Sequence, residues 1–166
     1  MDSYLERLRQ AVASATQGLC DKDLTRRTDG KWSPAEVLEH LYLTYTGTSK
    51  AFERCLKAGK PLASAPTLKH RVAAILVTEF GYFPEGRKSP DHACPKGISP
   101  EKVVADICPQ IEAMDKIIAQ CEELFGPRQK VLDHPVMGPL TASQWRKFHW
   151  IHGRHHIAQI VERRTS

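Results

Sequence analysis

The sequence predicts an all-α protein, a helix bundle of four main helices and one shorter helix, on the strength of three observations. Apolar residues recur at intervals of three and four along five segments, the spacing of an amphipathic helix. Two of these segments open with Ser-Pro, which joins a capping residue to a proline suited to the first helical turn. No segment reads convincingly as a strand. The 166 residues and their 41% hydrophobic content fit a single domain, residues 1–166, with a substantial core.

The first helix is expected over residues 3–17, and Gly18 is suited to end it. Its apolar residues recur with helical spacing at Leu5, Leu8, Val12 and Ala15. A polar connection is expected over residues 19–32.

The second helix has the strongest start signal in the chain. Ser33 can cap it, Pro34 fits its first turn, and Glu36 completes a capping box. We expect this helix to reach about Ala58, where Gly59 follows. His40 lies about 100° around the helix from Leu41, so it is expected at the edge of the apolar stripe.

A shorter helix is expected over residues 66–80, followed by a long connection over residues 81–100. This connection contains four prolines and three glycines, which disfavour a helix. Connections of this length in compact domains tend to be crossovers or site lids. Ser99-Pro100 then opens the fourth helix, which carries Pro109 as a candidate kink and ends at Gly126. Residues 128–140 are expected to form an ordered turn.

The last helix, expected over residues 141–164, carries four of the eight histidines. His152 and His156 are spaced i, i+4, so they lie about 40° apart on one helical face. This spacing allows one helix to offer two imidazoles to one metal ion, although such a pair can equally form hydrogen bonds or contact solvent.

His40 is a possible third metal ligand beside this pair. If the second and last helices are neighbours, His40, His152 and His156 can converge. Three neutral imidazoles can hold a divalent metal ion and leave at least one coordination position open. A water bound at such a position can ionise near neutral pH, and a bound thiol can lose its proton.

Other histidines compete for these roles. His149 and His155 lie on the same helix as the pair, and either could replace or join a ligand. His134 could act as a fourth ligand or hold its own loop by a hydrogen bond, and we favour the loop role. His70, between two basic residues, is expected on the surface.

Glu36 and Gln159 each lie one helical turn from a candidate ligand. Either could orient a histidine or a water molecule. A helix-capping role for Glu36 and a surface position for Gln159 explain them equally well.

Three stretches together resemble the DinB-like superfamily. They are Trp32–Leu41, similar to Trp-Ser-x-x-Glu-x-x-x-His-Leu; His152–Ile160, similar to His-x-x-x-His-x-x-Gln-Ile; and His134–Thr141, closest to a branch of unknown function. The resemblance implies an up-down-down-up four-helix bundle, frequently dimeric. It also implies a divalent metal, zinc or nickel, held by His40, His152 and His156. The superfamily includes thiol-dependent transferases and isomerases.

Two function hypotheses follow. The first is a metal-dependent enzyme, a hydrolase or a transferase, acting on a small-molecule substrate or a low-molecular-weight thiol. The second is a non-catalytic, metal-stabilised bundle that dimerises or binds a small ligand. The formal charge of +5 is spread along the chain rather than clustered, which does not favour nucleic-acid binding. No apolar run approaches a membrane span and no export signal is evident, so we expect a cytoplasmic protein.

Overall fold

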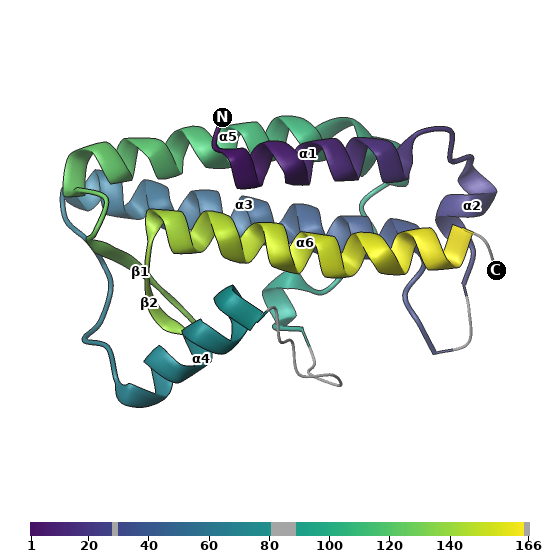
Figure 1. Ribbon diagram of the computed structural model, residues 1–166. Helices are drawn as coiled ribbons and strands as arrows, with labels where there is room; N and C mark the ends of the chain where they lie inside the picture. Colours follow the sequence, from purple (N-terminus) through teal and green to yellow (C-terminus); the bar gives the residue numbers. More distant parts are fainter. Residues whose placement is uncertain (28–29, 81–88, 165–166) are drawn as a thin grey trace.

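A computed structural model describes residues 1–27, 30–80 and 89–164 of the chain. Within these ranges four long helices form a bundle (Figure 1): α1 (Ser3–Thr16), α3 (Pro34–Ala58), α5 (Pro100–Phe125) and α6 (Ala142–Arg164). Helices α1 and α6 run in one direction, and α3 and α5 run in the other. The predicted all-α, up-down-down-up bundle is therefore confirmed.

Because α3 and α5 are parallel neighbours, the chain must return along the bundle between them. The return contains the shorter helix α4 (Leu68–Phe80) and a 3-10 turn, η1 (Asp91–Ala93). This confirms the predicted crossover. Part of the predicted connection, residues 81–88, lies outside the described residues.

The helix ends follow the predicted capping chemistry. Ser33 Oγ accepts a hydrogen bond from the Glu36 backbone N–H at 3.2 Å, and the Glu36 carboxylate accepts one from the Ser33 N–H at 2.8 Å. Gly59 ends α3 in the left-handed conformation, with φ of 63°. Thr141 and Gln144 form the same reciprocal pair of bonds at the start of α6.

Two elements differ from the sequence prediction. Residues predicted as a turn form an antiparallel hairpin, with β1 (Lys130–His134) paired to β2 (Gly138–Thr141). The sequence did not predict these strands because the consecutive residues Val131 and Leu132 are both apolar and both buried. The alternation of apolar and polar residues that indicates a strand is therefore absent. The predicted polar connection before α3 also contains a five-residue helix, α2 (Asp21–Thr25).

The bundle interior includes a buried ion pair. Arg146 of α6 donates to Asp115 of α5 at 2.9 Å, and Asp115 also accepts the backbone N–H of Asp2 at 2.8 Å. The largest fully buried side chains of the core are Tyr45, Phe52, Leu5, Leu8, Leu38, Leu41, Ile107, Ile111, Met114, Ile118, Met137 and Leu140.

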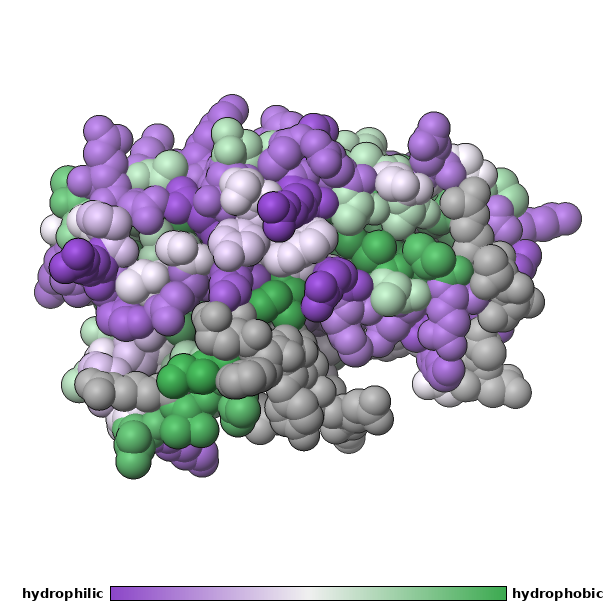
Figure 2. Space-filling view, in the orientation of Figure 1, coloured by the Kyte–Doolittle hydropathy of each residue, from purple (hydrophilic) through white to green (hydrophobic). Residues whose placement is uncertain are grey.

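Helix α4 packs on the bundle by one narrow face, through Ala74 and Val77. Four large apolar residues of α4 lie exposed: Leu68, Val72, Ile75 and Leu76. Figure 2 shows the resulting hydrophobic patch over α4 at the lower left of the molecule. Among the helices described here, none has the length and apolar content required to span a bilayer.

Candidate metal centre

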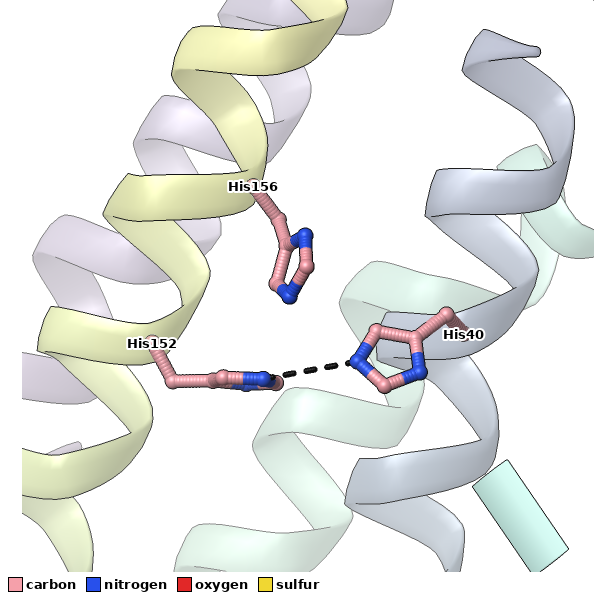
Figure 3. Close-up of side chains that lie close together, drawn as sticks. All are labelled: His40, His152 and His156. Atoms are coloured by element: carbon pink, nitrogen blue, oxygen red, sulfur yellow. Dashed lines mark hydrogen bonds between the residues drawn. The ribbon is translucent and has the colours of Figure 1, made fainter. Parts of the chain in front are cut away.

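Three histidines from two helices converge in the bundle. His40 comes from α3, and His152 and His156 come from consecutive turns of α6 (Figure 3). The Nε2 atoms of His40 and His152 lie 3.4 Å apart, and one nitrogen from each of the three rings falls within 4.8 Å of the others. The structure thus brings together the three residues that the sequence singled out.

His40 is more buried than the helical wheel predicts, with an exposed fraction of 3%. The prediction of a boundary position was wrong because the chain around η1 covers this side of α3. The Nδ1 atom of His40 lies 2.8 Å from the carbonyl oxygen of Ala93. A carbonyl can only accept, so Nδ1 carries the proton and Nε2 presents its lone pair to the other two rings.

His156 is oriented by a side chain of its own helix. Its Nδ1 lies 3.0 Å from Gln159 Oε1, so Nδ1 donates and Nε2 is left to act as a ligand. The amide nitrogen of Gln159 lies 3.2 Å from Nε2 of His155. His155 itself is exposed and outside the cluster. The contact between Gln159 and His156 supports the orienting role of Gln159 over a purely surface position.

The surroundings keep all three imidazoles neutral near pH 7. Burial, helped by the neighbouring His40, lowers the pKa of His156 to about 4. Burial also lowers the pKa of His40, against the opposing effect of its bond to Ala93. The pKa of His152 falls well below its usual value through burial first and through its histidine neighbours second. Only the neutral ring can bind a metal ion, so these shifts favour ligation.

The remaining candidate residues have other roles. His149 is fully buried among the rings of Tyr45, Trp145 and Phe148, and it is not part of the cluster. Glu36 caps α3 and pairs with Arg27, which supports its structural role.

His134 stays in its hairpin. Its Nδ1 accepts the backbone N–H groups of Val136 and Met137 at 3.2 and 3.3 Å, as the loop hypothesis predicts. His70 is half-buried against Gly138 and not fully at the surface, because α4 folds back over the hairpin.

One edge of the histidine cluster has the spacing expected around a tetrahedral metal ion. Two nitrogens that are each about 2.0–2.1 Å from a zinc ion at tetrahedral angles stand about 3.3–3.4 Å apart. The separation of 3.4 Å between Nε2 of His40 and Nε2 of His152 matches this edge. In the part of the chain that the structure describes, no cysteine, aspartate or glutamate joins the three histidines in the cluster.

Sequence reasoning missed one contributor to the site. The Ala93 carbonyl fixes the tautomer of His40, but a backbone atom 53 positions away leaves no residue-type signal. The bulky ring of Trp32, whose centroid lies 5.3 Å from that of His40, belongs to the quoted Trp-Ser motif and could have been found from it.

Fold and site together define a helical-bundle protein with a cluster of three histidines suited to a metal ion. Comparison with known families assigns it more closely. The chain belongs to the DUF1569 family of proteins of unknown function, whose pattern matches residues 3–163. It is 27% identical over 156 residues to the uncharacterized protein YuaE of Bacillus subtilis, covering 88% of this chain and 86% of that protein. The comparison with solved structures gave no significant match.

Proposed function

We propose that the chain is a DinB-like metalloprotein that binds one divalent ion, zinc or nickel, through His40, His152 and His156. We further propose that the centre is catalytic and acts on a small-molecule substrate, by hydrolysis or by activating a low-molecular-weight thiol. The observation that carries this proposal is the convergence of three ring nitrogens within 4.8 Å with no carboxylate or thiolate among them in the described residues.

The ligand count favours a catalytic centre over a purely structural one. Structural zinc sites usually have four protein ligands, whereas catalytic sites have three and keep a position for water or substrate. A bound divalent ion supplies Lewis acidity at that position, which lowers the pKa of a water or a thiol. The donor set of three imidazoles suits zinc, nickel, copper and iron better than magnesium or calcium.

The protein keeps the imidazole rings neutral and orients their Nε2 atoms toward the proposed metal position. The Ala93 carbonyl accepts a hydrogen bond from Nδ1–H of His40, and the Gln159 side-chain oxygen accepts one from Nδ1–H of His156. Both Nε2 atoms are therefore unprotonated and can bind the ion. Such partners raise the basicity of a ligand and fix its orientation. The order of the three motifs along the chain, and their resemblance to DinB-like proteins, supports the same assignment.

A non-catalytic role is the second candidate, and one observation favours it. The three histidines join α3 to α6, so an ion held between them would cross-link two helices of the bundle. Binding to the folded state alone stabilises it by mass action, whether or not chemistry follows. In this role the protein would act as a metal-stabilised module that forms a homodimer or binds a small ligand.

The test loads the purified protein with zinc, nickel or cobalt and assays panels of esters and of thiol acceptors. The double variant His152→Ala/His156→Ala, treated identically, is the control for contaminating activity. The catalytic proposal expects turnover that the double variant lacks. In the cobalt-loaded protein, a thiol-dependent enzyme should change its visible spectrum when the thiol is added, whereas a hydrolase should not. Metal binding without turnover in either panel would support the non-catalytic role instead.

A further inference from the structure

Glu39, the residue just before His40, is a buried carboxylate that the proposed chemistry does not use. Its exposed fraction is 2%, and it lies outside the histidine cluster. A buried carboxylate is costly unless hydrogen bonds satisfy it. The oxygens of Glu39 accept two backbone N–H groups, from Lys96 at 2.6 Å and from Gly97 at 3.1 Å. Bonds of this kind, to an ionised acceptor, are among the stronger ones in proteins.

These bonds fasten the end of the crossover to α3 beside the metal centre. Gly97 has a φ of 84°, in the left-handed region, and the turn there presents two successive amides to one carboxylate. Three residues before Lys96, the Ala93 carbonyl accepts the Nδ1 proton of His40. One turn of α3 therefore holds the same short segment at two points, through Glu39 and through His40.

The position of the Ala93 carbonyl decides how His40 faces its neighbours. While the carbonyl is in place, the proton stays on Nδ1 and the Nε2 lone pair points toward His152. If the segment moved away, the buried Nδ1–H would lose its acceptor, and the ring would gain by changing tautomer or rotating. A change of tautomer would protonate Nε2, and a rotation would turn it away from His152. In both cases Nε2 could no longer act as a ligand at this site.

We propose that Glu39 is a positioning residue of the metal centre, which acts by holding the Ala93 carbonyl against His40. The inference rests on the proposed metal site and adds a residue to it. Glu39 is not one of the three clustered residues. Its effect reaches the centre through residues 93–97 and the tautomer of His40.

The test compares Glu39→Gln with Glu36→Gln, a matched control one turn earlier on the same helix. The glutamine at position 39 keeps the shape of the side chain but turns an NH2 group toward one of the two backbone donors. Glu36 bonds to Ser33 and Arg27 at the start of α3, so its variant should disturb only the helix cap. The melting temperature of each metal-free variant verifies folding.

Two readouts are measured on each folded variant. The first is cobalt affinity together with the visible cobalt spectrum. We expect Glu39→Gln to bind cobalt about 10–100-fold more weakly with an altered spectrum, and Glu36→Gln to match the wild type. The second is the tautomer of His40 from nitrogen-15 chemical shifts of the metal-free protein. It should be Nδ1–H in the wild type and in Glu36→Gln, and mixed in Glu39→Gln. The conservative Glu39→Asp variant should recover part of both properties.

The outcomes separate this inference from the proposed function. Wild-type cobalt affinity, spectrum and His40 tautomer in Glu39→Gln would overturn the positioning role while leaving the metal site standing. A wild-type protein that binds no cobalt would overturn the metal site and this inference together. A shift of the His40 tautomer in Glu39→Gln, joined to weaker cobalt binding, would support both.

Discussion

The Nε2 atoms of His40 and His152 lie 3.4 Å apart, although 112 positions separate the two residues in the chain. Each ring also has a contact of its own. His40 is anchored to the Ala93 carbonyl, and His152 is carried by α6, where it stacks on Phe148 with the ring centroids 5.3 Å apart. The site therefore depends on how closely α3 and α6 pack within the bundle.

Gly153, next to His152, allows this close packing. A Cβ atom at this position would lie 2.3 Å from Leu8 Cδ1 and 3.0 Å from the hydroxyl of Tyr45. We expect Gly153→Ala to destabilise the fold by about 1–3 kcal/mol, because the buried side chains of α1 and α3 must shift.

The matched control is Gly47→Ala, on the exposed side of α3, where a Cβ would meet nothing within 4 Å. This change should stabilise the protein by about 0.5–1 kcal/mol through helix propensity alone. Urea denaturation of both variants measures the difference. Equal effects at the two glycines would contradict the packing described for α6.

Gln159 should influence the metal centre through His156. Replacing it by leucine removes the acceptor of the His156 Nδ1 proton, so the ring loses its fixed orientation. We expect Gln159→Leu to weaken zinc affinity by about 10–100-fold while the fold remains intact. Competition with a chromophoric chelator measures the affinity.

Gln159 also contacts His155, so His155→Ala is the appropriate control. This exposed residue lies outside the cluster, and its removal should leave zinc affinity unchanged. An equal loss of affinity in His155→Ala and Gln159→Leu would show that Gln159 acts through His155 and not through His156.

His149 should make the protein acid-sensitive. It is fully buried, and burial lowers its pKa to about 3 from a usual value near 6.5. Between these pH values the unfolded chain binds a proton that the folded protein excludes, so stability falls as the pH falls. From pH 6.5 to pH 4.5 this one residue should cost about 2 kcal/mol of stability.

His149→Phe tests that assignment, because phenylalanine keeps an aromatic ring and cannot titrate. Neither ring nitrogen of His149 has a hydrogen-bond partner among the described residues, so the change breaks no bond seen there. The variant should lose stability less steeply over this pH range than the wild type. Metal-free samples and denaturation at several pH values provide the measurement. An unchanged pH slope in His149→Phe would contradict the burial of a neutral imidazole.

Local chemistry made much of this fold predictable. Ser33-Pro34 and Ser99-Pro100 mark helix starts because capping and proline geometry act within a few residues of each other. The i, i+4 spacing of His152 and His156 likewise follows from one helix alone. The match of His40 to its motif supplied the third member of the cluster.

The features that the sequence did not predict depend on contacts between distant segments. The hairpin at residues 130–141 is buried on both faces at Val131 and Leu132, which removes the alternation that marks a strand. The burial of His40 depends on the chain around η1, and helical periodicity carries no information about that segment. The exposed stripe of α4 has a helical period too, but periodicity cannot say whether an apolar face meets the core or solvent.

The central claim is that His40, His152 and His156 bind one metal ion. The most direct measurement is metal content per chain by elemental analysis, on protein purified without a histidine tag and reconstituted with zinc. We expect about one equivalent in the wild type and in His155→Ala, and none in His152→Ala/His156→Ala. Less than about a tenth of an equivalent in the wild type, or equal content in the double variant, would contradict it.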